Sequence, residues 1–224
     1  MLNWVAEREI HKKGRRLYAF FIDLKAAFDS IDRDILWRTM IKMNIDKGLI
    51  RRIQELFKET INTVRVNGEE STQFWISAGV RQGCPLSCTL FALYIADLEE
   101  VLKQGQAGGV LIGKKKIWTL AYADDVVLLA TEEEHIKEMM KRLEKYLIKR
   151  ELHLNVEKSK MMVFKRGRES KKTREWKWKE QFIEEVSHFK YLGFMFQKNN
   201  SHEKHVWERH KRAEVCLGHW AKKV

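Results

Sequence analysis

The sequence is poor in the residues that mark disulfide-rich, linker-rich or membrane-spanning proteins. Its 224 residues include only three cysteines and one proline, so neither a disulfide framework nor a proline-rich linker is expected. No apolar run approaches the roughly 20 residues that a membrane helix requires. Residues 1–16 are charged throughout and lack the apolar segment of a secretory signal. We therefore expect an intracellular, soluble, globular protein with no membrane partner.

Acidic residues are also in the minority, since 43 Lys+Arg stand against 31 Asp+Glu and the formal net charge is +12. The excess is uneven, because residues 158–179 hold ten basic and two acidic residues, which gives that segment +8. A smaller basic cluster lies within residues 8–16. Such clusters suit nucleic acid or an acidic membrane surface, but an ordinary solvated surface has the same composition. Charge alone therefore suggests a polyanionic partner without establishing one.

Hydrophobic periodicity alternates between strand and helix patterns along the chain. The nearly unbroken apolar run at 17–24 predicts a buried strand, and apolar residues recur at helical spacing over 136–147. Pro85 is expected to open a helix that continues to about Val101. Asn67-Gly68 predicts a tight hairpin turn. Strands, helices and hairpins in this order predict an α+β fold in which helices back one antiparallel sheet.

Acidic residues at two places contradict ordinary folding preferences. Asp23 lies inside an apolar run, where an unpaired buried carboxylate is costly. Asp124 and Asp125 occupy the expected turn of a strand–turn–strand over 117–130, although such turns prefer Asn-Gly or Asp-Gly and adjacent carboxylates repel each other. Taken singly, a strand end and an exposed turn would explain them equally well. Taken together, they match the carboxylate cluster of two-metal phosphoryl transfer, in which carboxylate oxygens hold Mg²⁺.

Five segments follow one another in a distinctive order, namely FIDLKAAFD (21–29), GVRQGCPLS (79–87), YADD (122–125), LNVEKSK (154–160) and FKYLGF (189–194). Together they resemble the reverse transcriptases, and most of all those of non-LTR (LINE-type) retrotransposons. The RQGCPLS run favours that group over the relatives in group II introns. YADD distinguishes the chain from RNA-templated RNA polymerases, which usually carry Gly-Asp-Asp at this turn. The resemblance covers about residues 17–196.

The resemblance implies a polymerase palm, with an antiparallel sheet backed by helices, truncated fingers and a thumb that has only begun. Residues 1–16 are then expected to form a basic N-terminal remnant, and residues 17–200 the reverse transcriptase palm with partial fingers. Residues 201–224 are expected to be a basic helical segment at the start of a thumb. The resemblance also implies a nuclear location at the time of integration. The oligomeric state is left undefined.

The function that the resemblance implies is RNA-directed DNA polymerase, the core of a retrotransposon protein. Such an enzyme transfers nucleotides from a dNTP to a primer 3′-hydroxyl, so the expected partners are an RNA template, a DNA primer and dNTP. The alternative is a catalytically inactive nucleic-acid-binding remnant of such an element. The shortness of the upstream region favours the remnant, whereas the intact Asp23 and YADD favour the enzyme.

The resemblance assigns roles position by position. Asp23, Asp124 and Asp125 would be catalytic residues and the ligands of two Mg²⁺ ions, for which Mn²⁺ could substitute. Lys158 would be a catalytic residue that protonates or neutralises the departing pyrophosphate, although it also reads as one member of a basic run in which Lys160 competes. The other matches are Phe28, Gln82 and Gly83 as nucleotide-binding residues, and Tyr191, Leu192 and Gly193 as the primer grip.

Two aromatic positions keep an ordinary alternative beside the functional one. Phe28 would exclude a 2′-hydroxyl from the incoming sugar, or it is simply a core aromatic at the start of a helix. Trp176 and Trp178 alternate with lysines, which suits either the stacking of bases or the buried face of a strand. For the carboxylates we predict a geometry. The strands of Asp23 and of the Asp124-Asp125 turn should be sheet neighbours, with Asp23 and Asp124 facing one pocket and at least one pKa raised by crowding.

Overall fold

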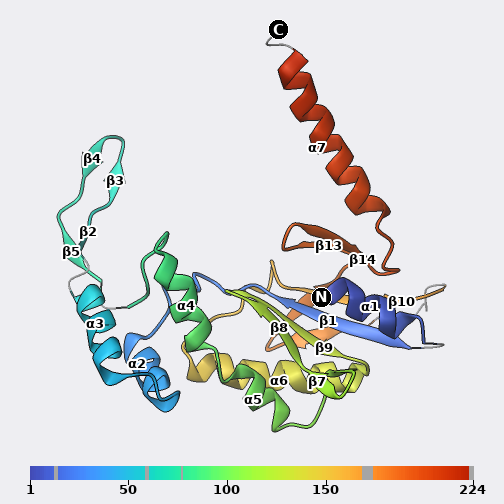
Figure 1. Cartoon of the computed structure of the whole chain (residues 1–224), viewed down its shortest axis with the longest axis horizontal. Coiled ribbons are helices and arrows are strands. Elements are labelled where there is room, and N and C mark those ends of the chain that lie inside the picture. Colours follow the sequence, from blue (N-terminus) through green and yellow to red (C-terminus); the bar gives the residue numbers. More distant parts are fainter. Residues whose placement is uncertain (13–14, 59–60, 77, 168–173, 222–224) are drawn as a thin grey trace.

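The computed structural model describes residues 1–12, 15–58, 61–76, 78–167 and 174–221, and its centre is a six-stranded sheet (Figure 1). The strand order is β11-β12-β10-β1-β9-β8, and every pair is antiparallel except β10–β12. The strands are β1 (Arg16–Ile22), β8 (Thr119–Tyr122), β9 (Asp125–Ala130), β10 (Lys160–Lys165), β11 (Trp176–Trp178) and β12 (Gln181–Glu185). The predicted α+β class is confirmed.

Strand β1 is central because it carries apolar side chains on both faces. Six consecutive residues, 17–22, are buried, and the strand is hydrogen-bonded to β10 on one edge and β9 on the other. Alternation along a strand sends successive side chains to opposite faces. The even-numbered residues of β1 enter one hydrophobic core and the odd-numbered ones another. The sheet is therefore the middle of three layers.

Helices cover one face of the sheet. They are α2 (Arg33–Lys42), α4 (Pro85–Tyr94), α5 (Leu98–Lys103) and α6 (Glu133–Lys149). In Figure 1, α5 and α6 lie below the sheet. The helical spacing predicted over 136–147 is confirmed, since Ile136, Met140, Leu143 and Leu147 are all buried against this face. Asp32 caps α2 by accepting the backbone N–H of Ile35 at 2.7 Å, so this aspartate serves the fold.

The opposite face is covered by α1 (Leu2–Ile10) and by a hairpin of β13 (His188–Tyr191) and β14 (Phe194–Gln197). The hairpin packs aromatic rings on β1, with the Phe21 centroid 4.8 Å from Phe189 and 5.2 Å from Tyr191. A short ribbon of β6 (Val110–Ile112) and β7 (Lys115–Ile117) precedes β8 and adds Val110 to this core. Aromatic packing therefore holds the 189–194 segment against β1.

The single helix expected from Pro85 to about Val101 is wrong, because α4 ends at Tyr94 and α5 starts at Leu98. The interruption contains Asp97, whose carboxylate accepts the Tyr146 hydroxyl at 2.6 Å and forms an ion pair with Arg150. The Arg150 side chain is largely buried, and a buried guanidinium without a partner would be strongly destabilising. The Asp97–Arg150 ion pair therefore contributes more to stability than a continuous helix from α4 to α5 would.

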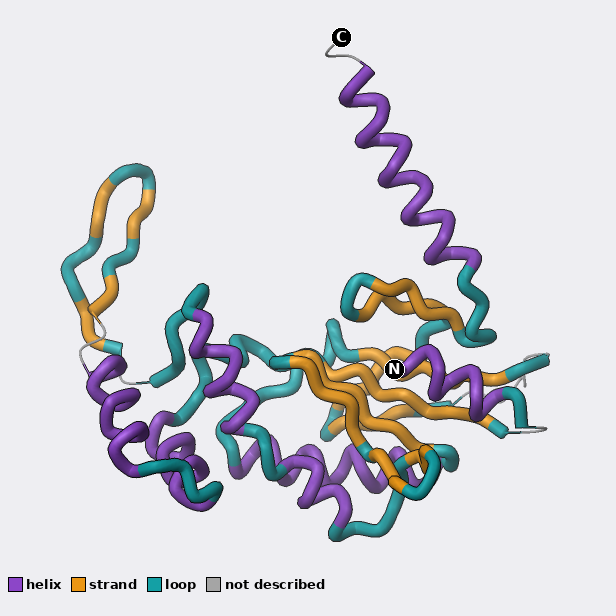
Figure 2. The backbone as a smooth tube through the Cα atoms, viewed as in Figure 1, coloured by secondary structure: helices purple, strands orange, loops and turns teal. Residues whose placement is uncertain are grey.

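An arm extends from the helical side of the sheet (Figure 1). It consists of β2 (Ile61–Asn62), β3 (Arg65–Val66), β4 (Glu69–Glu70) and β5 (Phe74–Trp75) and follows α3 (Lys47–Lys58), whose buried face belongs to the helical core. Figure 2 shows its strands and loops standing apart from the sheet. The turn predicted at Asn67-Gly68 is confirmed, with φ of 52° and 89° between the paired Val66 and Glu69. The branched and aromatic residues of the hairpin nevertheless remain in solvent.

The last described element, α7 (Glu203–Ala221), projects away from the sheet beyond the β13–β14 hairpin (Figure 1). Its first turns contact that hairpin. The His205 ring stacks on Phe194 at a centroid distance of 4.1 Å, and Lys190 pairs with Glu208 at 2.6 Å. Across the described parts of the chain, no helix combines the length and apolar character needed to cross a bilayer.

Candidate active site

Two carboxylates face each other where β1 and β9 meet. The last registered pair of these antiparallel strands is Ile22↔Val126, so Asp23 and Asp125 come next on opposite strands and on the same face. Both line a cavity of about 450 Å³ beside the sheet. The prediction that the two strands are neighbours in one sheet is confirmed, although the direct counterpart of Asp23 is Asp125 and not Asp124.

The turn of the β8–β9 hairpin lies one residue earlier than predicted. Tyr122 pairs with Asp125, so Ala123 and Asp124 are its central residues and Asp125 is the first residue of β9. Ala123 adopts φ of 54°, a left-handed conformation that strains a residue with a Cβ. The register of β9 is set by five buried residues, 126–130, and a slip would send each to the wrong face. Packing of the strand therefore places the turn, against local preference.

Crowding of the carboxylates is visible in the electrostatics of Asp125. Burial is the main cause that raises its pKa, and the neighbouring carboxylates of Asp124 and Asp23 raise it further. The predicted increase of at least one pKa is confirmed at Asp125, with burial as a larger cause than the crowding on which the prediction was based. Since the folded state disfavours the ionised form of Asp125, a cation bound among these three groups would relieve an existing repulsion.

Asp23, Asp124 and Asp125 have the ligand chemistry that a hard divalent cation requires, but their side chains do not converge on one point. Carboxylate oxygens are the ligands that Mg²⁺ prefers, and the repulsion at Asp125 favours its binding. Within the described ranges, however, no three His, Cys, Asp or Glu side chains converge as a metal site. Asp23 and Asp125 face the cavity and Asp124 lies in the turn. The ligand roles assigned to Asp23, Asp124 and Asp125 stay predictions.

Lysines surround the same cavity, which Lys158, Lys160 and Lys190 line together with Asp23 and Asp125. The Lys160 ammonium pairs with Glu184 at 2.8 Å, and Lys190 pairs with Glu208 at 2.6 Å. Lys158 is exposed in the turn between α6 and β10. Because the Lys160 ammonium is already engaged, the structure favours Lys158 of the two candidates that the sequence left open. Its catalytic role stays a prediction.

The GVRQG segment packs on the loop that follows Asp23. Gly79 donates its backbone N–H to Ile31 at 2.7 Å, and Val80 donates to Phe28 at 2.9 Å. A Cβ on Gly79 would lie 2.8 Å from the Asp29 carbonyl oxygen, and its φ is +76°. The resemblance singled out Gly83 as a nucleotide-binding residue, but a Cβ there would meet no described residue within 4 Å apart from its chain neighbours. Gly79, the first residue of that segment, is the glycine the fold itself requires.

The nucleotide-binding candidates gather on this packed loop. Phe28 is half-buried with its ring 5.4 Å from that of Phe91, so it is anchored to α4. The Gln82 amide donates to both carboxylate oxygens of Asp29, at 3.0 and 3.2 Å. These side chains form a second group, distinct from the residues that line the cavity of Asp23 and Asp125. Loop 24–32 joins the two groups. Contact of Phe28, Gln82 or Gly83 with a nucleotide stays a prediction.

The primer-grip candidates lie at the tip of the β13–β14 hairpin. Leu192 and Gly193 form its two-residue turn with φ of 47° and 76°. The Tyr191 hydroxyl donates to the backbone carbonyl of Asp125 at 3.1 Å. Burial raises the pKa of Tyr191 above its usual range, and the Asp125 and Asp124 carboxylates add to the increase. Tyr191 therefore stays a neutral donor and ties this hairpin to the YADD hairpin.

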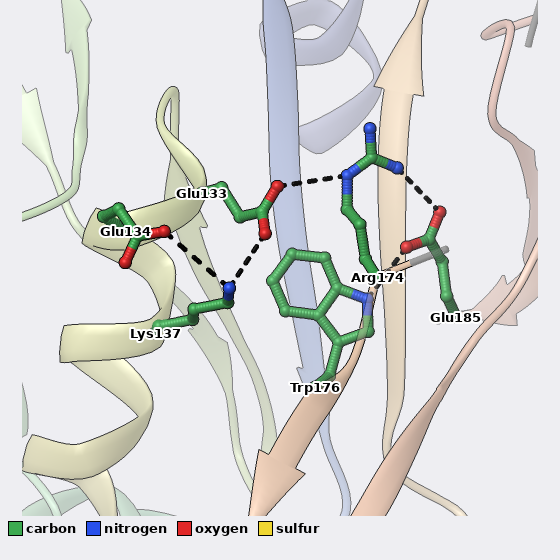
Figure 3. Close-up of polar contacts among 6 residues, drawn as sticks. All are labelled: Glu133, Glu134, Lys137, Arg174, Trp176 and Glu185. Carbon is green, nitrogen blue, oxygen red and sulfur yellow. Dashed lines mark hydrogen bonds and ion pairs between the residues drawn. The ribbon is translucent and has the colours of Figure 1, made fainter. Parts of the chain in front are cut away.

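The basic segment 158–179 is less available to a polyanion than its composition suggests. Figure 3 shows Arg174 between Glu133 and Glu185, at 3.2 and 3.4 Å, with its side chain only 4% exposed. Trp176 and Trp178 are buried, and the Trp176 indole donates to Glu185 at 2.8 Å. The buried-strand interpretation of the two tryptophans is confirmed and base stacking by them is wrong. Arg168, Lys171 and Lys172 lie outside the described residues.

Comparisons with known proteins agree with this architecture. Residues 2–196 match the family model described as "Reverse transcriptase (RNA-dependent DNA polymerase)". The Pol polyprotein of the R2 retrotransposable element of Popillia japonica is 30% identical over 146 residues, which are 65% of this chain and 24% of that protein. The probable RNA-directed DNA polymerase from transposon X-element of Drosophila melanogaster is 26% identical over 90% of this chain and 22% of its own length.

A solved structure shares the fold. Apo telomerase from Candida tropicalis, truncated from its C-terminal domain, superposes with a TM-score of 0.59 over 89% of this chain and 38% of that chain. At 16% identity this likeness concerns the fold alone. The chain thus spans about a quarter of the R2 relative and little more than a third of the telomerase chain.

Proposed function

The chain belongs to the reverse transcriptase family, and from that premise we propose that it is the palm of an RNA-directed DNA polymerase from a non-LTR retrotransposon. The observation that carries the proposal is the placement of Asp23 and Asp125 opposite each other on adjacent strands, in one cavity with Lys158. In the proposed reaction a primer 3′-hydroxyl attacks the α-phosphate of a deoxynucleotide, and pyrophosphate leaves.

Asp23, Asp124 and Asp125 hold two Mg²⁺ ions in this proposal, and Mn²⁺ is the substitute. Bound there, the ions supply charge stabilisation to the attacking and leaving oxygens. Burial and the neighbouring carboxylates raise the pKa of Asp125, so a cation bound beside it would offset a cost that the folded state already carries. Lys158, exposed at the rim of the cavity, gives a proton to the departing pyrophosphate or balances its charge.

The remaining candidates position the substrates. Phe28, fixed against Phe91, closes the space where a 2′-hydroxyl would enter. Gln82 and Gly83 line the nucleotide, and Gly83 leaves room for a close approach. Tyr191, Leu192 and Gly193 hold the primer end, because their hairpin is bonded to the backbone of Asp125. An RNA template, a DNA primer and dNTP are the proposed partners, which suits a net charge of +12.

A second candidate function is a nucleic-acid-binding remnant without turnover. It is favoured by the lack of a converged metal site within the described residues. The two candidate functions differ in activity, because an inactive remnant would still bind nucleic acid but would not incorporate nucleotides.

The test is single-nucleotide incorporation on an RNA template with a labelled DNA primer, under single-turnover conditions in Mg²⁺ or Mn²⁺. Fluorescence anisotropy of the same duplex measures binding in parallel. We expect the wild type and the exposed-site control Asp34→Asn to extend the primer, while Asp23→Asn binds the duplex and extends nothing. If the wild type binds the duplex but does not extend the primer in either metal, the polymerase proposal is rejected and the inactive nucleic-acid-binding remnant is retained.

A further inference from the structure

The backbone of Asp23 sits where the sheet hydrogen bonding of β1 ends on the β10 side. The β1–β10 ladder stops at Phe21↔Lys160, because the chain before Lys160 folds into a turn at 155–159. The N–H and C=O of Asp23 therefore need partners from outside that ladder. A buried peptide group without a partner is costly, so these two groups must be accounted for.

Ser159 supplies what the ladder does not. Its side-chain oxygen accepts the N–H of Asp23 at 3.0 Å and lies 3.4 Å from the Asp23 carbonyl oxygen, to which its hydroxyl donates. A hydroxyl has one proton to give and lone pairs to receive, so one side chain serves both groups. The Asn155 N–H donates to the same carbonyl at 2.8 Å.

Burial separates Ser159 from an ordinary surface serine. The residue has 0% of its surface exposed, although it lies between the exposed Lys158 and the partly exposed Lys160. The turn is closed by the Ser159 N–H, which donates to the Asn155 carbonyl at 2.9 Å. The same turn carries Lys158 on its outer side, so the clamp that Ser159 makes on Asp23 also sets where that lysine stands.

We propose that Ser159 is a positioning residue for Asp23, fixing the direction of its carboxylate by holding both peptide groups of the aspartate, and that it sets Lys158 in register with that carboxylate. The inference rests on the proposed function, in which Asp23 is the working carboxylate. Loss of the hydroxyl leaves the Asp23 N–H without a partner and frees the chain around it. The carboxylate then samples several directions, and metal binding must select one of them.

The test compares Ser159→Ala with Ser159→Thr, which retains the hydroxyl, and with Thr39→Val as a matched control. Thr39 is also buried, and its hydroxyl donates to Ile35 and accepts from Arg150, both at 2.8 Å, on α2 away from the carboxylates. Three quantities are measured: amide hydrogen exchange of residues 21–25 without metal, Mn²⁺ affinity followed by electron paramagnetic resonance, and single-nucleotide incorporation. Ser159→Cys, with its weak donor, replaces Ser159→Ala if the latter does not fold.

We expect Ser159→Ala to lower protection at 21–25 and to weaken Mn²⁺ binding, each about tenfold, as the loss of one buried hydrogen bond predicts. The rate constant for incorporation should fall while KM for the nucleotide changes little. Ser159→Thr should stay within about threefold of wild type, and Thr39→Val should lower Tm without changing Mn²⁺ affinity.

Three results would overturn the inference: unchanged exchange at 21–25 in Ser159→Ala, unchanged Mn²⁺ affinity in the same variant, or an equal loss of Mn²⁺ affinity in Thr39→Val. Wild-type protein that binds no Mn²⁺ would overturn it as well. Failure of the proposed function is read separately. The proposed function fails if the wild type binds Mn²⁺ and the duplex but incorporates no nucleotide. In that case amide hydrogen exchange at 21–25 and Mn²⁺ affinity still test the role of Ser159.

Discussion

Two hairpins of this chain have the same loop length, and opposite forces hold them. In the arm, Asn67-Gly68 supplies the positive φ values that the turn needs, while strands β3 and β4 stay in solvent. In the β8–β9 hairpin, Ala123 takes a positive φ against its preference, and β9 is buried along residues 126–130. Turn chemistry therefore sustains the arm hairpin, and strand packing sustains the YADD hairpin. A turn held by packing is free to carry residues chosen for another purpose.

Each hairpin also carries an adjacent acidic pair, which gives the sharpest contrast between them. Asp124→Asn in the buried hairpin should lower single-nucleotide incorporation on the order of 10³-fold, because it removes a charge from the cluster proposed to bind the metal ions. Glu69→Gln, in the exposed hairpin, is the matched control and should stay within about twofold of wild type. The measurement is the single-turnover rate of nucleotide incorporation in Mg²⁺ for both variants and the wild type. Comparable losses in both variants would erase the distinction between the hairpins.

The joint between arm and palm should be the position most sensitive to added volume. Gly79→Ala places a Cβ against the backbone of Asp29 at a positive φ, so we expect a loss of about 2–4 kcal/mol in the free energy of unfolding. Gly83→Ala has the same backbone strain and open space around it, and should cost only about 1–2 kcal/mol. Urea denaturation of both variants provides the values. A smaller loss for Gly79→Ala than for Gly83→Ala would contradict the packing described here.

Exchanging the turn residues tests which force holds each hairpin. Gly68→Ala should cost about 1–2 kcal/mol, but only within the arm, since the new Cβ would meet no described residue within 4 Å apart from its chain neighbours. Hydrogen exchange should therefore rise at 61–76 while Tm stays constant. Ala123→Gly should relieve strain and stabilise the chain by less than about 1 kcal/mol, because glycine adds entropy to the unfolded state. A fall in Tm for Gly68→Ala would show that the arm contributes to the core.

The smallest expected effect is the pH dependence of stability at Asp125. Its pKa is raised in the folded state, so its contribution to stability is complete below the unfolded pKa and is lost as pH rises through the folded value. Asp125→Asn does not titrate. Its Tm should match that of the wild type at acidic pH and exceed it near neutrality. Thermal melts across that range test this, and a Tm below that of the wild type at neutral pH would contradict the crowding of the carboxylates.

Features that depend on neighbours in sequence were predictable from the sequence. The apolar stripe of α6 and the Asn67-Gly68 turn follow from spacing and turn chemistry alone, and both were correct. The helix from Pro85 failed because its interruption depends on an ion pair between Asp97 and Arg150, which are 53 residues apart. The YADD turn was misplaced by one residue because its register is set by the burial of β9 and not by turn preference.

The same limit applies to the candidate site. The resemblance brought Asp23 and the YADD segment together, because ordered motifs carry information about distant contacts that periodicity lacks. It named Gly83 and passed over Gly79 and Ser159, whose partners lie in other elements. Ser159 bonds a residue 136 positions away. A small polar residue between two lysines has no local signal, and only its burial in the fold reveals it.

The projecting helix α7 has a mechanical consequence. It comprises 19 residues, so at 1.5 Å per residue it is about 28 Å long. Its base is fastened by the stack of His205 on Phe194 and by the Lys190–Glu208 pair, both on the hairpin whose Tyr191 hydroxyl donates to the Asp125 carbonyl at the start of β9. A tilt of about 10° at that base would move the far end by about 5 Å. The β13–β14 hairpin is therefore the pivot of α7. A small rotation of the helix at this hairpin would displace the far end of α7 by nearly one helical turn.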